Sequence, residues 1–233
     1  MTSMHRTLVI MAKAPRVGAV KTRLAKSLPV QAVTELYGCL LNDTIALAQT
    51  LDQVEIAIMC PASDVEDMLL AAATPVRVVP QIGSGLAAAL DSVFVNFAAA
   101  GRAGVIAFNS DTPHLPASAL QSAFEVLETC DLVIGPTYDG GYYLVGARAP
   151  HPGLFTHDGM GTATALDALL QRASTLNLSV RVIDPFYDID VEADLSQLTA
   201  ELQRMPRKAP RTAEWLLAWR RATPQTAQNG GAE

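Results

Sequence analysis

A basic loop directly after the first apolar run constrains this chain more than any other feature. Residues 6–12 form an apolar, β-branched run of strand length, and residues 13–24 follow it with Pro15 and Gly18 among them. No acidic residue precedes Glu35, whereas six cationic residues do: Arg6, Lys13, Arg16, Lys21, Arg23 and Lys26. A helix expected after the loop would add free N–H groups and the positive end of its dipole. In a chain of net charge −6, this segment predicts a pocket for a triphosphate or a diphosphate.

A solvated basic surface is the alternative interpretation of this loop. Pro15 and Gly18 argue against it, because they fix the backbone just before Lys21 and Arg23, where a helix is expected to begin. The Walker pattern Gly-x-x-x-x-Gly-Lys-Ser/Thr and the dinucleotide pattern Gly-x-Gly-x-x-Gly are both missing from this region. We therefore expect a phosphate loop of another kind, with these nucleotide-binding residues: Lys13, Pro15, Gly18, Lys21, Thr22, Arg23 and, in a later glycine turn, Gly85.

Strand-like and helical patterns alternate along the chain. The expected strands cover residues 6–12, 54–60, 76–79, 104–109, 132–136, 142–146 and 180–183. The expected helices cover residues 30–50, 63–73, 86–99, 117–128, 163–174, 188–203 and 211–221. This order predicts a three-layer α/β/α fold, doubly wound around a mostly parallel sheet with one antiparallel hairpin. We expect residues 1–222 to form a single domain and residues 223–233 to be a flexible tail.

Carboxylates follow two of the expected strands. Asp111 comes after the apolar strand 104–109, and Asp190 lies in the segment Asp188-Ile189-Asp190 after the last strand. Ligands of doubly wound sheets bind beyond the carboxyl ends of the strands, so we expect both carboxylates to meet the basic loop. A polyphosphate is commonly shared with Mg²⁺ or Mn²⁺, and Asp111 and Asp190 are the predicted metal ligands. Helix capping is the alternative role, because each aspartate also stands near an expected helix start.

The hairpin between strands 132–136 and 142–146 is a candidate for the acceptor side of the site. Gly140 and Gly141 would let a ligand approach the backbone, and the ring of Tyr142 can stack on a sugar or a base. Asp139 can orient or deprotonate a hydroxyl group of the acceptor. A type I′ turn explains the Asp-Gly-Gly sequence equally well, and the sequence leaves both interpretations open.

Several other kinds of site are disfavoured. The four histidines have no metal-binding spacing, and no Gly-x-Ser-x-Gly elbow presents a nucleophile. Direct transfer fits better, with Lys21 and Arg23 stabilising the developing charge and Asp139 near the acceptor. The acidic balance argues against nucleic acid as a partner. No apolar run approaches the roughly 18–20 residues of a membrane span.

The beginning of the chain and its cysteines point to the cytoplasm. The N-terminus lacks the plan of a signal peptide, because Lys13 and Pro15 interrupt a short apolar run. Cys39, Cys60 and Cys130 are widely spaced in apolar surroundings, which is typical of reduced core residues. We therefore expect a cytoplasmic protein.

Four motifs in one order resemble a bacterial family of the nucleotide-diphospho-sugar transferase superfamily. They are Lys13-x-Pro15-x-x-Gly18-x-x-Lys21-Thr22-Arg23-Leu24, Ser110-Asp111-x-Pro113-x-Leu115, the run from Gly135 to Leu144, and Asp188-Ile189-Asp190. That family is described as GT-A-type glycosyltransferases of unassigned function. The first and last motifs are also similar to the 2-phospholactate guanylyltransferases. The resemblance covers about residues 6–200 and implies a GT-A-like fold. It also implies that residues 13–23 hold the nucleotide phosphates and that Asp111 and Asp190 hold the divalent ion.

The resemblance leaves three functions open. The first is transfer of a nucleotidyl group from a nucleoside triphosphate to a small, phosphorylated acceptor, and the pair of cations in the loop gives it a slight preference. The second is glycosyl transfer from a nucleotide-sugar to a small-molecule acceptor. The third is a nucleotide-binding protein of weakened activity, because residues 83–88 and 160–162 depart from the family's pattern.

The last expected helix, residues 211–221, is a separate feature. Trp215 and Trp219 are four residues apart and share one face, with Arg211, Arg220 and Arg221 around them. We expect this helix to pack on the domain or on a second subunit of a homodimer. Peripheral contact with an anionic membrane is the alternative.

Overall fold

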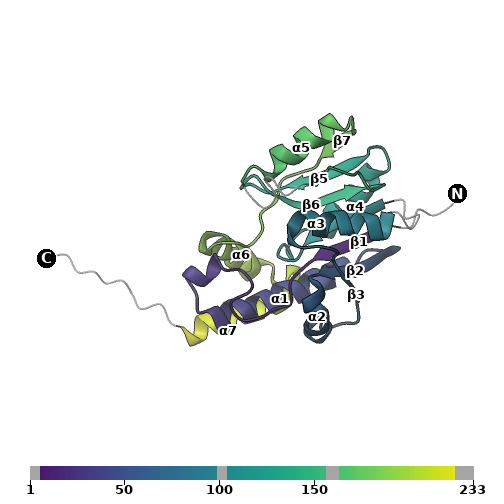
Figure 1. Cartoon of the computed structure of the whole chain (residues 1–233). Helices are drawn as coiled ribbons and strands as arrows, with labels where there is room; N and C mark the ends of the chain where they lie inside the picture. Colours follow the sequence, from purple (N-terminus) through teal and green to yellow (C-terminus); the bar gives the residue numbers. More distant parts are fainter. Residues whose placement is uncertain (1–5, 99–103, 156–162, 224–233) are drawn as a thin grey trace.

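A seven-stranded sheet forms the centre of the computed structural model, which describes residues 6–98, 104–155 and 163–223 (Figure 1). The strands are β1 (Arg6–Met11), β2 (Val54–Cys60), β3 (Arg77–Pro80), β4 (Gly104–Asn109), β5 (Leu132–Pro136), β6 (Tyr142–Ala147) and β7 (Val180–Val182). Their spatial order is β3-β2-β1-β4-β6-β5-β7. Strand β6 runs antiparallel to β4 and to β5, and the other neighbouring strands are parallel. The predicted mostly parallel sheet with one antiparallel hairpin is confirmed.

Helices cover both faces of the sheet. They are α1 (Val30–Ala48), α2 (Val65–Ala71), α3 (Gly85–Val93), α4 (Ala117–Leu127), α5 (Ala165–Thr175), α6 (Glu192–Arg204) and α7 (Pro210–Ala222). Alternate side chains of a strand point to opposite faces, so Leu8 and Ile10 of β1 pack with α1, α2 and α4. Val9 packs on the other face with α3 and α5. The two cores give the three-layer α/β/α fold that the sequence predicts.

Helices α6 and α7 pack against the side of α1 that faces away from the sheet (Figure 1). Leu40 of α1 meets Leu198 and Leu216 there, in a third apolar cluster. Asp43 is buried beside it and accepts hydrogen bonds from the N–H and the hydroxyl of Thr212, each at 2.8 Å. A side chain of α1 therefore caps the first turn of α7, and the predicted C-terminal helix is docked on the domain.

The hairpin between β5 and β6 is not closed by a two-residue type I′ turn. The N–H of Thr137 donates to the carbonyl of Gly141 at 3.0 Å, so residues 138–140 form a three-residue loop. This alternative for the Asp-Gly-Gly sequence is wrong in its loop length, because the sequence does not show where strand pairing stops.

The strands β1, β2, β3 and β4 are parallel, so their carboxyl ends open on one edge of the sheet. The residues that follow them are therefore neighbours in space, although they are far apart in sequence. None of the helices in the described ranges is long and apolar enough to cross a membrane.

Candidate functional site

A cavity of about 610 Å³ opens at this edge of the sheet. Residues at the ends of four strands line it: Met11 and Ala12 after β1, Met59 and Pro61 at β2, Gln81 after β3, and Ser110 and Asp111 after β4. The start of α3 contributes Gly85 and Leu86, and the basic loop contributes Lys13, Lys21, Thr22 and Arg23. Five predicted nucleotide-binding residues thus share one cavity wall. Pro15 and Gly18 are not among the lining residues.

Three aspartates converge at this cavity. Carboxylate oxygens of Asp111, Asp188 and Asp190 lie within 4.8 Å of one another. Asp111 follows β4, and the other two precede α6, so the chain brings them together from opposite ends of the fold. Carboxylate oxygens are ligands that Mg²⁺ and Mn²⁺ accept, so these three residues could hold such an ion.

Ile189 explains the geometry of the Asp188-Ile189-Asp190 segment. Its side chain is fully buried in the cluster of α1, α6 and α7, which directs the flanking aspartates away from that cluster. Asp194 then holds the segment, because its carboxylate accepts the N–H groups of Asp190 at 2.9 Å and Val191 at 2.8 Å. Asp194 is thus the capping residue of α6. Asp188 was not among the predicted ligands, although the period-two spacing across an apolar residue signalled it.

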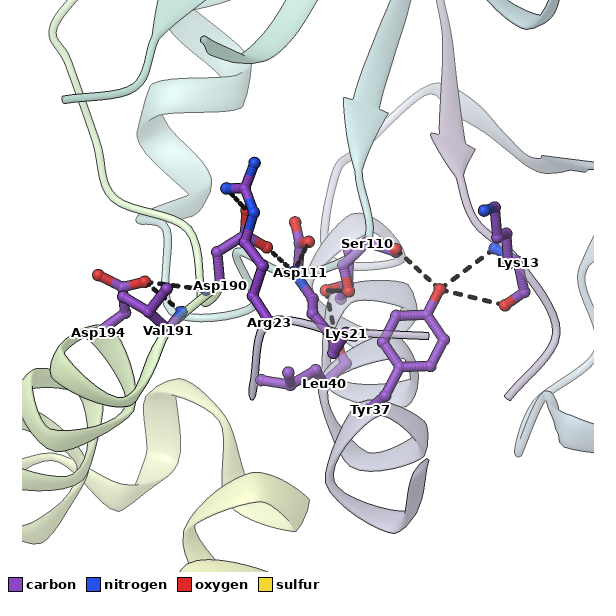
Figure 2. A network of polar contacts seen from close by, with 11 residues as sticks. Lys13, Lys21, Arg23, Tyr37, Leu40, Ser110, Asp111, Asp190, Val191 and Asp194 are labelled. Carbon is purple, nitrogen blue, oxygen red and sulfur yellow. Dashed lines mark hydrogen bonds and ion pairs between the residues drawn. The ribbon is translucent and has the colours of Figure 1, made fainter. Parts of the chain in front are cut away.

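Lys21 pairs with the carboxylates of Asp111 and Asp190 (Figure 2). Its ammonium donates to Oδ2 of Asp111 and, at 2.7 Å, to Oδ1 of Asp190. The side chain is only 7% exposed, although it reaches the cavity wall. Arg23 donates to Oδ2 of Asp190 at 3.1 Å and is 57% exposed, so its guanidinium also faces solvent. One buried cation and one exposed cation therefore sit against the same carboxylates.

The charges at the site shift one another's pKa values. Burial by itself lowers the pKa of Lys21, but the negative charges of Asp111 and Asp190 outweigh it and hold the pKa above its ordinary value. Burial and the charges of Asp111 and Asp190 raise the pKa of Asp188. The site is therefore crowded with negative charge, and Lys21 compensates part of it.

Tyr37 of α1 ties the basic loop to the end of β4 (Figure 2). Its hydroxyl donates to the carbonyl of Lys13 at 3.1 Å and accepts the N–H of Lys13 at 3.2 Å. The same oxygen lies 3.1 Å from Oγ of Ser110, the residue before Asp111. The sequence placed Tyr37 on the buried face of its helix but gave no signal of this bridge.

The remaining cations of the loop region have other tasks. Arg16 pairs with Asp64 at 2.5 Å and with Asp67 at 2.6 Å, which fastens the loop to α2. Arg6 pairs with Glu128 at 2.7 Å. Among the six cations before Glu35, only Lys13, Lys21 and Arg23 line the cavity.

No α-helix begins at Lys21 and Arg23, where the sequence predicted a helix start, although the helix predicted over residues 30–50 is found as α1. A 3₁₀ turn at Leu24–Lys26 follows the loop, and α1 begins only at Val30. Lys21 has a positive φ of 48°, a conformation that does not continue into a helix. The lining residues from α1 include Tyr37 in its middle and none from its first turn. The start of α1 therefore does not face the cavity, and the helix start that lines it is that of α3, at Gly85 and Leu86.

The hairpin residues lie outside the cavity wall. Asp139 accepts hydrogen bonds from its own loop, from Oγ1 of Thr137 at 2.5 Å and from the N–H of Gly141 at 3.2 Å. Gly140 has a positive φ of 89°, and a Cβ there would lie 1.9 Å from the carbonyl oxygen of Ala163. The space beside Gly140 is therefore occupied by the backbone of Ala163 rather than left open for a ligand. Tyr142 is half-buried in β6 and is not a lining residue.

The first departure from the family's pattern, at residues 83–88, lies at the start of a helix. Residues 83–88 open α3, and Gly83 and Gly85 both have positive φ values, so this turn depends on glycine. Residues 160–162 lie outside the described part of the chain.

Comparisons with known proteins agree with the fold. A crystal structure of a protein from Desulfovibrio desulfuricans G20, provisionally described as a nucleotide-diphospho-sugar transferase, superposes with a TM-score of 0.84. It is 24% identical, and the match covers 94% of this chain and 96% of that chain. The 4-diphosphocytidyl-2C-methyl-D-erythritol synthase of Anaerococcus prevotii matches with a TM-score of 0.54 at 14% identity, over 84% and 95% of the two chains.

A third structure is CMP:2-keto-3-deoxy-manno-octonic acid synthetase complexed with CTP. It matches with a TM-score of 0.51 at 11% identity, over 86% of this chain and 99% of that chain. No curated protein matches the sequence. A family described as uncharacterized protein conserved in bacteria (DUF2064) matches residues 44–162, and the chain belongs to that family.

Proposed function

We propose that this member of the DUF2064 family is a metal-dependent nucleotidyltransferase. It transfers the nucleotidyl group of a nucleoside triphosphate to a small, phosphorylated acceptor and releases pyrophosphate. The proposal rests on the observation that Lys21 and Arg23 line one cavity together with Asp111 and Asp190, and that Lys21 pairs with both aspartates and Arg23 with Asp190. Asp188 lies close to the same two carboxylates. Neighbours of the same fold that are named as nucleotidyl-transferring enzymes support this reaction class.

The aspartates fit a divalent ion. Asp111 has one carboxylate oxygen, Oδ1, that is buried and has no hydrogen-bond partner among the described residues. A buried carboxylate oxygen without a partner is costly unless a cation or water meets it. Asp111, Asp188 and Asp190 would hold Mg²⁺ or Mn²⁺, which would neutralise phosphate charge during the transfer.

The cavity has a polar half and a less polar half. Lys13, Lys21 and Arg23 stand on the polar side and would bind the phosphate groups. Met11, Met59, Leu86 and the amide of Gln81 line the remainder, which suits a nucleoside. The substrate would therefore lie with its base over the ends of β1 to β3 and its phosphates toward β4.

In the proposed reaction an oxygen of the acceptor attacks the α-phosphorus of the triphosphate. The new P–O bond forms as the bond to the β-phosphate oxygen breaks, and pyrophosphate leaves with the electron pair of that bond. Lys21 and Arg23 bind the phosphate oxygens and stabilise the charge that develops on the leaving group. Removing one such contact typically lowers the rate by about 10²–10³.

Glycosyl transfer from a nucleotide-sugar is the second candidate. The specific observation in its favour is the match to the Desulfovibrio desulfuricans protein, which is provisionally described as a nucleotide-diphospho-sugar transferase. Asp139 would serve the acceptor in this case, because it lies near Asp188. Burial, Asp111 and Asp190 raise the pKa of Asp188 most, and the charge of Asp139 raises it further. Gly140, Gly141 and Tyr142 would border the acceptor.

One assay separates the candidates. Purified protein is incubated with Mg²⁺ or Mn²⁺, a panel of nucleoside triphosphates and nucleotide-sugars, and phosphorylated and hydroxylic acceptors. Release of pyrophosphate is the expected result, whereas release of nucleoside diphosphate from a nucleotide-sugar identifies the glycosyltransferase. Binding of a nucleotide with neither product would indicate a nucleotide-binding protein of weakened activity.

A further inference from the structure

The C-terminal part of the chain carries a concentration of positive charge. Of the 17 lysines and arginines, six lie between residues 204 and 221: Arg204, Arg207, Lys208, Arg211, Arg220 and Arg221. Glu214 is the acidic residue in this segment, whereas the chain as a whole has a net charge of −6. These residues belong to the end of α6, the 3₁₀ turn Pro206–Lys208 and α7. We call the exposed part of these elements the basic surface.

Most of this charge is not used within the fold. Lys208 pairs with Glu201 at 2.6 Å. Within the described ranges, no ion pair is formed by the five arginines, all of them exposed: Arg204, Arg207, Arg211, Arg220 and Arg221. Their guanidinium groups are therefore available to an external anion.

An apolar groove runs through the basic surface. It has a volume of about 480 Å³, and its lining includes the buried Leu202 and Leu216. Three exposed charged residues also line it, namely Arg207, Arg220 and Glu214, so its net charge is positive. Leu217 also lines it and is 53% exposed. Carbon surface and cationic groups thus meet at one place, which is what an amphiphile with an anionic head requires.

The platform under the groove is firmly held. Asp43 caps α7 through Thr212, and Leu216 packs in the cluster that α7 shares with α1 and α6. Helix α6 has 13 residues and is therefore about 20 Å long, and its first turn follows directly on Asp190. The basic surface thus includes the far end of the helix whose start follows Asp188 and Asp190 in the chain.

We propose that the basic surface docks the protein on a bilayer that contains anionic phospholipids. The arginines bind the headgroup phosphates, and the groove together with Leu217 and Met205, which is 46% exposed, accepts acyl carbon. This inference is independent of the reaction proposed above, because none of the residues it uses lines the cavity at the sheet edge.

Other occupants fit less well. A second copy docking through the same surface around a two-fold axis would bring the arginines of one subunit against those of the other. A nucleic acid would pair with the arginines but would leave the apolar groove and Leu217 unused. An anionic bilayer is complementary to the charge and to the groove at once.

Vesicle cosedimentation of the full-length protein tests the proposal. We expect binding to vesicles of phosphatidylglycerol and phosphatidylethanolamine at low ionic strength, weaker binding at high salt, and little binding to pure phosphatidylcholine. The double variant Arg207→Gln/Arg220→Gln should lower the partition coefficient roughly 25-fold, because each cation near an anionic surface contributes about fivefold. Leu217→Ser should weaken binding without changing its salt dependence.

The matched control is Arg148→Gln/Arg181→Gln, which removes the same charge near β7, on the far side of the molecule from α7 (Figure 1). It should bind vesicles like the wild type. Absence of binding to the anionic vesicles, or equal binding to phosphatidylcholine, would overturn the proposal. The proposal would also be overturned if the Arg207→Gln/Arg220→Gln variant bound vesicles like the wild type but had lost duplex DNA binding or concentration-dependent dimerisation.

Discussion

Lys21 is the residue on which the site depends most. Its ammonium pairs with Asp111 and Asp190, two of the three carboxylates that would hold a divalent ion in the proposed function. Under that proposal, the ion and the ammonium would compete for the same oxygens while no phosphate is present. On entry of a metal-bound polyphosphate, the ammonium would exchange its carboxylate partners for phosphate oxygens.

This competition predicts an unusual phenotype for Lys21→Met, which keeps most of the length of the side chain but removes its ammonium group and its charge. Without nucleotide, the variant should bind Mn²⁺ about tenfold more tightly than the wild type, because no ammonium has to be displaced. Nucleotide affinity should fall in the same variant. Titration calorimetry measures both, with Lys26→Met, at an exposed position off the cavity, as the control. Weaker metal binding in a folded Lys21→Met protein would contradict the competition.

Tyr37→Phe tests the bridge between the loop and β4. The change removes one hydroxyl and leaves the N–H of Lys13 and the hydroxyl of Ser110 without this partner. We expect a loss of about 1–3 kcal/mol in the free energy of unfolding, together with weaker nucleotide binding. Urea denaturation measures the first quantity. Tyr138→Phe, at a 72% exposed position, should stay within about 0.5 kcal/mol of the wild type.

At the scale of elements, the sequence predicted the elements with strong periodicity best. The apolar face of α1 and the continuous apolar run of β4 are found where those patterns indicated them, because burial dictates both. The use of individual cations was predicted less well. Arg16 and Lys21 look alike in the loop sequence, but only the folded chain brings Asp64 to one and Asp111 to the other.

The attachment of α7 to α1 depends on one buried carboxylate. Asp43→Ala would leave the N–H and hydroxyl of Thr212 without their acceptor, so we expect a loss of about 2 kcal/mol in the free energy of unfolding. The two tryptophans of α7 report its detachment by fluorescence. Asp52→Ala removes the same charge from an exposed turn and should have no measurable effect. Equal stability of the two variants would show that the cap is not needed.

At the scale of the whole molecule, the sequence predicted the sheet and the edge at which loop and carboxylates meet. Strands β1 and β4 are parallel neighbours, so the meeting of the loop with Asp111 follows from topology. Strand β7 lies at the edge of the sheet, and Asp190 reaches the same place only through the segment between β7 and α6. The third aspartate and the bridging tyrosine do not follow from topology, since they depend on how α1 and α6 pack. The cationic residues of the basic surface are visible in the sequence, but the groove forms only when α6 and α7 pack together.

The stability of the whole molecule should depend on pH through His114. This side chain is fully buried, its ring lies 4.3 Å from that of Tyr187 and 4.9 Å from that of Phe186, and neither ring nitrogen has a hydrogen-bond partner among the described residues. Burial lowers the pKa of His114 to about 4, while Glu201 raises it slightly and Lys208 opposes that. The unfolded chain therefore binds the proton more readily, and stability is lost as pH falls from about 6.5 to 4.

Replacing this histidine isolates the effect. The free energy of unfolding of the wild type should decline toward pH 4 by up to roughly 3 kcal/mol more than that of His114→Phe. Denaturant unfolding at a series of pH values measures the difference. Parallel curves for the two proteins would mean that His114 does not stay neutral in the fold.

The central claim is that the cations of the loop bind a metal–polyphosphate unit together with Asp111, which follows β4, and Asp188 and Asp190, which precede α6. Calorimetric titration of nucleoside triphosphates and nucleotide-sugars, with Mg²⁺ and again with a chelator, tests it most directly. We predict that the preferred nucleotide binds at least about tenfold more tightly with Mg²⁺, and that Asp190→Asn abolishes this difference. Equal affinity with and without the metal, or no binding of any nucleotide, would contradict the claim.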